Sequence, residues 1–226
     1  MTRWGMVRDL DKCTACQACI VACKVENSVP IVEPEQANMG RTILWNEMLT
    51  HVEGEFPNVH LHMVPRPCMH CDNPPCVKVC PVGATWKNSE GIVEIDTDIC
   101  IGCRYCMVAC PYGARSFNWY APEFVDTHAQ YINPDVSPRP RGVVEKCTYC
   151  IHRIRKARAE GKLIGSDYKD GVVPACVQTC PASAIFFGDL DDSNSTVAIK
   201  AHSHRATQLL AELGTEPKTI YLQEAS

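Results

Sequence analysis

The sequence predicts an α+β fold of two small cysteine-rich modules, one nested within the other, with long loop insertions and a C-terminal helix. Two observations predict it. The 226 residues hold 16 cysteines in four groups of four, and three of these groups end in a Cys-Pro segment that continues into β-forming residues, namely CPVGATW, CPYGARSF and CPASAIFF. A unit of loop, helical turn, proline stop and short strand therefore repeats along the chain.

The cysteine groups fall into three spacings. The first and third groups share C-x2-C-x2-C-x3-C, in CTACQACIVAC and CIGCRYCMVAC, and no cysteine is left over. The second group reads C-x2-C-x4-C-x3-C, and the fourth spreads over C-x2-C-x25-C-x3-C. The four groups are Cys13, Cys16, Cys19 and Cys23; Cys68, Cys71, Cys76 and Cys80; Cys100, Cys103, Cys106 and Cys110; and Cys147, Cys150, Cys176 and Cys180.

The distances between the groups indicate how they pair. Only 19 residues separate the second group from the third, and SEGIVEIDTD within them predicts a turn and a strand. That length suits a compact module with two cysteine groups. The first and fourth groups must then pair across the whole chain. We therefore expect an outer module from residues 1–67 and 141–226, and an inner module at 68–140 that carries a loop insertion.

Two segments between the groups lack the repeating pattern. Residues 24–67 and 111–146 are rich in proline and aromatic residues, which predicts loops. Such loops could lie on a partner, lie on the other module, or form plain surface. The sequence leaves these alternatives open.

Two amphipathic patterns lie in the C-terminal third. IHRIRKARAEGK, residues 151–162, predicts a basic helix with Ile151 and Ile154 on its buried side, Gly161 as its stop and its arginines on a solvated face. SHRATQLLAELG, residues 203–214, predicts a second helix that is followed by a strand, KTIYLQ. The side chains expected to point inward from this second helix are Leu209, Leu210 and Leu213.

The cysteine spacing favours iron–sulfur clusters. A short loop of this kind places thiolates around one face of a cubane, and the run followed by proline is the bacterial ferredoxin signature, whose fourth cysteine ligates the other cluster of a pair. Zinc is the first alternative because C-x2-C is also its signature, but a third cysteine three positions later has no role in a tetrahedral site. Disulfides fit less well, since such near neighbours would close strained rings.

Composition excludes several classes of protein. A net charge of −4 and a pI near 6.1 give no general attraction to nucleic acid. No run of 18 apolar residues could span a membrane, and MTRWGMVRDLDKC lacks the apolar stretch of a signal peptide. No G-x-G-x-x-G after a strand, P-loop or nucleophile motif is present. We therefore expect a soluble or peripheral protein that is not itself an enzyme.

The motifs together resemble one family. RWGMVRDLDKCTACQACIVACK, CMHCDNPPCVKVCPVGA, CIGCRYCMVACPYGARSFNW, EKCTYC and ACVQTCPASAIFFGDLDD look like the four-cluster ferredoxin subunit of the complex iron–sulfur molybdoenzymes, which include dimethyl sulfoxide, polysulfide, tetrathionate and arsenate reductases. The resemblance covers residues 3–190. The long gap in the fourth group and the ending LLAELGTEPKTIYL are most similar to the branch that contains iron–sulfur subunits of quinone reductase complexes and alternative complex III.

The resemblance implies an electron-transfer subunit that carries a row of four [4Fe-4S] clusters between two partners. One is a catalytic subunit with a molybdenum or tungsten bis-pterin cofactor, and the other is an integral membrane quinone subunit of the polysulfide reductase type. The chain would then be peripheral and held at the membrane by its partner, on a side that the sequence does not indicate. In order from the catalytic subunit, the implied ligand sets are Cys13, Cys16, Cys19 and Cys180; Cys147, Cys150, Cys176 and Cys23; Cys68, Cys71, Cys76 and Cys110; and Cys100, Cys103, Cys106 and Cys80.

Side chains near the cysteines carry further expectations. Cys103 lies in the group in which several relatives in the family replace one cysteine and hold a three-iron cluster, so its presence here predicts four-iron clusters throughout. The nearby charges of Arg104 and Arg115 should raise the potential of the third group, and Asp96 and Asp98 should oppose them. The two histidines beside cysteines are expected to form hydrogen bonds and not to ligate iron; they are His70 and His152.

Two other functions stay open at the level of sequence. One is a zinc-organised structural or interaction protein, which iron, sulfide and zinc assays would distinguish. The other is the iron–sulfur subunit of a quinone reductase complex that lacks a molybdenum site. For the complex itself, the frequencies within the family favour respiratory metabolism of a sulfur or arsenic compound.

Overall fold

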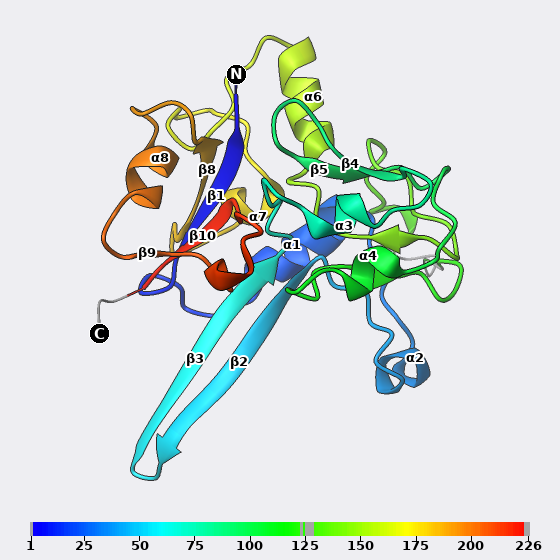
Figure 1. Ribbon diagram of the computed structural model, residues 1–226, viewed down its shortest axis with the longest axis horizontal. Coiled ribbons are helices and arrows are strands. Elements are labelled where there is room, and N and C mark those ends of the chain that lie inside the picture. Colours follow the sequence, from blue (N-terminus) through cyan, green and yellow to red (C-terminus); the bar gives the residue numbers. More distant parts are fainter. Residues whose placement is uncertain (1, 123, 125–128, 224–226) are drawn as a thin grey trace.

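A four-stranded sheet joins the two ends of the chain in this computed structural model, which describes residues 2–122, 124 and 129–223. The strand order is β8-β1-β10-β9, with β1 antiparallel to β8 and parallel to β10 (Figure 1). The strands are β1 (Trp4–Asp9), β8 (Ile185–Asp189), β9 (Ala206–Thr207) and β10 (Thr219–Leu222). The first strand of the chain is thus held between strands made near its end.

Alternating side chains explain why this sheet has two buried faces. Met6 and Phe187 point into the main core, where Trp4 stacks on Phe187 with ring centroids 5.3 Å apart. Val7 points to the opposite face and packs with Val197 of helix α8 (Thr196–Ala201). Both faces of β1 are therefore covered, which matches its uninterrupted burial.

The predicted repeat of helical turn and short strand is confirmed. Each Cys-Pro segment follows a one-turn helix and leads into a strand, as the sequence pattern indicates. The turns are α3 (Pro75–Lys78), α4 (Tyr105–Val108) and α7 (Ala175–Gln178), and the strands after them are β4 (Thr85–Lys87), β6 (Ser116–Phe117) and β8. Strand β5 (Val93–Ile95) pairs with β4, and β7 (Val144–Glu145) pairs with β6.

The cysteine loops share one backbone device. The residue before the second cysteine of each group has a positive φ, in Ala15, His70, Gly102 and Tyr149. This left-handed residue turns the chain so that consecutive thiols can face one centre. At Gly102 the turn is also crowded, because a Cβ atom there would lie 2.1 Å from the carbonyl oxygen of Gly142.

The first insertion is not a loop, and that expectation was wrong. After the short helix α2 (Pro34–Asn38), it forms a long antiparallel hairpin of β2 (Asn46–Glu55) and β3 (Asn58–Pro67), which projects from the body of the molecule (Figure 1). Apolar and polar residues alternate along both strands with a period of two, and this signal outweighs the proline content. In the second insertion, residues 123 and 125–128 lie outside the described part.

The predicted helix at residues 203–214 was also wrong. In its place are β9, which pairs with β10, and a single turn of 3-10 helix at Ala211–Leu213. Leu210 has a φ of 50° and is 41% exposed, so it neither continues a helix nor points inward. Pairing with β10 outweighs the local helical pattern. The strand expected at 218–223 is present as β10.

The basic helix is present as α6 (Ile151–Ala159), and α1 (Ala18–Glu26) follows the first cysteine loop. Ile151 and Ile154 are buried as expected. Its cationic side chains are more than a solvated face, since they form ion pairs with acids of other elements: Arg153 with Glu26, Arg155 with Glu94, Lys156 with Asp135 and Arg158 with Glu90. Within the described residues, no helix combines the length and apolarity needed to cross a bilayer.

Candidate functional site

One cavity gathers three cysteines of the first group with one from near the other end of the chain. Cys13, Cys16 and Cys19 line it together with Cys180. The loop before α1 supplies the first three, and the turn after α7 supplies the fourth. All sixteen cysteines lie in the described part, and none forms a disulfide.

A second cavity joins the second and third groups in the same manner. Three cysteines of the second group line it with one of the third, namely Cys68, Cys71, Cys76 and Cys110. Burial raises the pKa of Cys71 to about 12, and its cysteine neighbours act in the same direction. The thiols therefore need a positively charged group between them before they can all ionise.

The remaining cysteine of the first group meets the fourth group. The Asn27 amide donates to the Cys23 Sγ at 3.6 Å and to the Cys150 Sγ at 3.8 Å. Burial raises the pKa of Cys23 well above its ordinary value, and the adjacent Cys147, Cys150 and Cys176 raise it further. These four cysteines therefore form one buried set.

The last set is only partly assembled by the described contacts. Burial raises the pKa of the Cys106 thiol, and the nearby Cys100 acts in the same direction. Arg115 opposes both effects. Cys103 is exposed, and Cys80 is half-buried. Backbone N–H groups of residues 82–85 point at Cys80 and, against the effect of burial, lower the pKa of its thiol. The contacts above do not bring Cys80 and Cys103 together, so this set rests on the sequence.

Two cysteine loops meet through a stacked pair of rings. The backbone N–H groups of His70 and Tyr149 donate to the sulfurs of Cys68 and Cys147 respectively, both at 3.5 Å. The two rings stack with centroids 3.8 Å apart. His70 is fully buried, and its Nδ1 accepts a hydrogen bond from the N–H of Val93. This agrees with a histidine that forms hydrogen bonds, in a buried position that the sequence did not indicate.

The other histidine lies in an ion-pair cluster between two helices. His152 and Arg153, at the start of α6, both bond Glu26 at the end of α1, with distances of 2.7 Å and 2.5 Å. Burial alone would raise the pKa of Glu26, but these hydrogen bonds lower it to about 2. These ion pairs hold α1 against α6, the two helices that begin inside the first and fourth cysteine groups.

A buried arginine provides the strongest test of whether the cysteines fit a bound cluster. Arg8 is 1% exposed, and none of its three guanidinium nitrogens has a hydrogen-bond partner. It lines the first cavity, and nearby thiolates such as Cys176 and Cys19 raise its pKa against the effect of burial. An isolated buried charge costs several kcal/mol. Thiolates around an anionic iron–sulfur cluster supply the missing countercharge, so the residues fit that cofactor.

A second arginine occupies the corresponding place by the second cavity. Arg115 is 5% exposed and donates to Thr85 at 3.3 Å, while its other terminal nitrogen has no hydrogen-bond partner. Cys76 and Cys106 raise its pKa, although burial opposes them. Arg115 therefore lies between a cysteine of the third ligand set and one of the fourth. The sequence suggested Arg115 but missed Arg8, which alternation places on the inward face of β1 with Trp4 and Met6.

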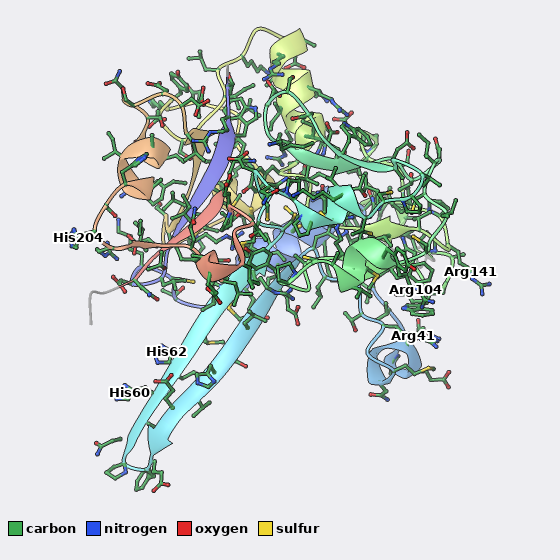
Figure 2. The ribbon with its side chains drawn as sticks, viewed as in Figure 1. Arg41, His60, His62, Arg104, Arg141 and His204 are labelled. Atoms are coloured by element: carbon green, nitrogen blue, oxygen red, sulfur yellow. The ribbon has the colours of Figure 1, made fainter. Side chains whose placement is uncertain are left out.

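The exposed end of the third group carries a cationic surface. The guanidinium groups of Arg41 and Arg104 lie 5.0 Å and 4.9 Å from the ring centroid of Trp119. Figure 2 shows these two arginines and Arg141 at one end of the molecule, beside α4. Arg104 thus reaches away from the cysteines and stacks on aromatic rings, so its expected effect on a cluster potential is weaker than that of Arg115.

Comparison with known proteins identifies the chemistry of these sites. Two family models described as "4Fe-4S dicluster domain" match the chain, one at residues 59–127 and the other at 12–84 and 99–184. The second model covers well over half of the chain. The chain thus belongs with proteins that carry [4Fe-4S] clusters, and its sixteen cysteines match the number that four such clusters need.

Similar proteins are electron-transfer subunits of larger complexes. The chain is 46% identical to the iron–sulfur cluster-binding subunit of menaquinone reductase from Nitratidesulfovibrio vulgaris, over 97% of this chain and 88% of the relative. It is 40% identical to a subunit of the selenate reductase from Mesobacillus selenatarsenatis, over 97% and 72%. It is 37% identical to the arsenate respiratory reductase iron–sulfur subunit of Shewanella sp. strain ANA-3, over 98% and 96%.

The cavities, the buried arginine and these relatives agree. The chain therefore belongs to the family of four-cluster iron–sulfur electron-transfer subunits of molybdoenzyme reductases and menaquinone reductases.

Proposed function

We propose that this chain connects a molybdopterin-type catalytic subunit to an integral membrane quinone subunit and has no catalytic site of its own. Its relatives include subunits named for sulfite dehydrogenase, tetrathionate reductase and arsenate respiratory reductase, which favours a respiratory oxidoreductase of a sulfur or arsenic compound. The chain would be held at the membrane through the quinone subunit. The observation that carries the proposal is the convergence of Cys13, Cys16 and Cys19 with the distant Cys180.

We infer that the sixteen cysteines form four sets in two nested modules, with an outer module at 1–67 and 141–226 and an inner module at 68–140. The sheet that joins β1 to β8 and β10 supports the outer module, and the two cavities support the first and third sets. The sets in order are Cys13, Cys16, Cys19 and Cys180; Cys147, Cys150, Cys176 and Cys23; Cys68, Cys71, Cys76 and Cys110; and Cys100, Cys103, Cys106 and Cys80.

The residues of the chain then have separate tasks. A bound cluster supplies one-electron transfer, at a potential set by charge, hydrogen bonds and exposure. Arg8 and Arg115 place positive charge between neighbouring sets, and the backbone N–H groups of His70 and Tyr149 donate to cysteine sulfurs. Both effects stabilise the more negative, reduced state. The stacked rings of His70 and Tyr149 fill the space between the second and third sets.

A quinone reductase complex without a molybdenum site is the second candidate. The menaquinone reductase subunit is 46% identical, the same value as for an iron–sulfur subunit named for dimethyl sulfoxide reductase and above those for the selenate and arsenate reductase subunits. In that case the electrons that reach the chain would come from a different donor. The cysteine sets would serve equally well, so only the partners distinguish the two functions.

Purification of the native complex under anaerobic conditions tests the proposal. The chain is tagged in its own host, and the copurified subunits are identified and assayed for iron, acid-labile sulfide, zinc, molybdenum and tungsten. We expect about sixteen irons per chain, a pterin cofactor with molybdenum or tungsten, and a membrane subunit that binds quinone. A complex with quinone reductase activity but without either metal would support the second candidate and contradict the first.

A further inference from the structure

The hairpin of β2 and β3 is larger and more exposed than its own contacts can explain. Two strands of ten residues extend over about 34 Å at the usual rise of a strand. Residues 49–62 are all exposed, and Figure 1 shows the hairpin leaving the body without a neighbouring element along most of its length. A two-stranded hairpin alone in water is marginally stable, and its edges are open to pairing. Its length therefore indicates that something covers it.

The two faces of the hairpin differ sharply. The strand register pairs Val52 with Leu61, and Thr50 with Met63, so these four side chains share one face. Val52 and Leu61 are 60% and 58% exposed, and Phe56 at the turn is 92% exposed. One continuous face of the projecting hairpin is thus apolar and open to water. We call this face the apolar arm face; it consists of Thr50, Val52, Phe56, Val59, Leu61 and Met63.

The opposite face is polar beyond its base, where Leu49 pairs with Val64. His51 pairs with His62 across the strands, and Glu53 lies within ion-pair distance of both, at 3.3 Å and 3.6 Å. His60 lies opposite Glu53. Figure 2 shows His60 and His62 pointing outward from the hairpin. An antiparallel sheet with one apolar and one polar face packs its apolar face and leaves the other in solvent.

The apolar arm face leads directly to the first cysteine cavity. Met48 and Pro65, which are paired at the base of the same face, line that cavity together with Cys16. Cys16 is itself exposed. A partner that approaches this cysteine set closely enough to exchange electrons would meet the arm on the same side of the molecule.

We propose that the apolar arm face is a docking surface for the catalytic subunit, which lies along the hairpin and reaches the cysteine set of Cys13, Cys16, Cys19 and Cys180. This inference rests on the proposed function, because that function places the catalytic subunit next to this set. The occupant presents an apolar strip to Val52, Leu61 and Phe56. The polar face, with its histidines and glutamates, remains in water.

Two matched double variants test the docking surface. Val52→Lys with Leu61→Glu places a cross-strand ion pair on the apolar arm face, and His51→Lys with His62→Glu places the same pair on the polar face. Each variant is coexpressed with the tagged catalytic subunit of the native complex, and recovery of the chain is measured. We expect the first variant to reduce recovery at least tenfold and the second to change it less than twofold. Both should keep the wild-type iron content.

Hydrogen exchange on the wild-type chain provides a second measurement. Residues 48–63 should exchange at least tenfold more slowly in the complex than in the free chain. Equal recovery of the two variants, or unchanged exchange of the hairpin in the complex, would overturn the docking surface. A free wild-type chain that forms a dimer, which the Val52→Lys and Leu61→Glu changes convert to a monomer, would also overturn it in favour of a second copy. If the iron-loaded wild type itself fails to bind a molybdopterin subunit, the proposed function fails and not the arm alone.

Discussion

Two regions of the molecule hold an arginine among cysteines, but they differ in their access to water. Around Arg8, the cysteines Cys23, Cys147, Cys150 and Cys176 are all buried, and the guanidinium nitrogens have no hydrogen-bond partner. Cys76 and Cys106 beside Arg115 are buried too, but the proposed fourth set, to which Cys106 belongs, also holds the exposed Cys103 and the half-buried Cys80 and Cys100. Thr85 accepts a hydrogen bond from this arginine. Charges interact more strongly where water is excluded. The Arg8 region should therefore depend more on each of its charged and ligating groups than the Arg115 region does.

The largest difference is expected from removing one cysteine in each region. Cys150→Ala removes a thiolate from a fully buried set, so the whole cluster should be lost. The iron content should therefore fall by about four irons per chain. Cys103→Ala removes an exposed thiolate, so a three-iron cluster should remain and only about one iron should be lost. Iron assays and EPR of the anaerobically purified variants measure both results. Equal iron loss from the two variants would contradict the expected difference between the two regions. A three-iron EPR signal at full occupancy from the unmutated protein would contradict the prediction of four [4Fe-4S] clusters.

The next effect concerns the ion pairs of Glu26 with His152 and Arg153, which join α1 to α6. Glu26→Gln should lower the free energy of unfolding by about 3 kcal/mol at pH 7, because hydrogen bonds from His152 and Arg153 hold the pKa of Glu26 at about 2, below its ordinary value of 4.5. A lowered pKa stabilises the fold fully above about pH 5, and this contribution disappears as the pH falls toward 2. The difference between wild type and variant should thus shrink by about 1 kcal/mol between pH 7 and pH 4.

Urea unfolding of the cluster-loaded protein, followed by visible absorbance, measures that difference. Lys156→Gln is the matched control, because Lys156 also leaves α6 to bind an acid, Asp135, but both side chains are exposed, at 58% and 45%. An ion pair of two exposed side chains contributes little to stability, so this control should unfold at nearly the same urea concentration as the wild type. A control variant that unfolds as easily as Glu26→Gln would show that burial does not distinguish the two ion pairs.

A third prediction uses Arg8 itself. Arg8→Met should lower the potential of the clusters ligated by Cys19 and Cys176 by about 100 mV, because a unit charge about 7 Å away contributes about 2 kcal/mol at an effective dielectric constant of 20. The positive charge stabilises the reduced state, so its removal lowers the potential. Redox titration followed by EPR provides the measurement. Unchanged potentials would mean that Arg8 is not the countercharge of these clusters.

The smallest shift is expected from the corresponding change in the other region. Arg115→Met should lower the potential of the clusters ligated by Cys76 and Cys106 by about 50 mV, since the exposed Cys103 gives the fourth set a higher effective dielectric constant. The same titration on both variants gives the ratio of the two shifts. A shift larger than that of Arg8→Met would reverse the proposed order of the two regions.

Much of the arrangement could be predicted from the sequence because cysteine spacing restricts the backbone strongly. The repeated turn, strand and Cys-Pro unit was predicted for β4, β6 and β8, as was the buried side of α6. The spacing requires the same left-handed residue in each loop, which leaves few conformations. Where short repeats with strict spacing control the fold, local sequence is sufficient.

The remaining features depend on contacts between distant residues. Residues 203–214 have a helical pattern, but pairing of β9 with β10 replaces it. The role of Arg8 required knowing that β1 faces cysteines from positions 19 and 176. The hairpin was missed for a different reason, because its alternation was visible and the proline content was given more weight.

The position of β1 in the sheet has a consequence for synthesis of the protein. This strand is made first, yet its two neighbours, β8 and β10, leave the ribosome only when the chain is nearly complete. The cysteine loop after β1 therefore cannot meet Cys180 until about four fifths of the chain has been made. The sheet around β1 thus cannot be completed until the last strands have been made, whereas residues 68–110 are all made before β8.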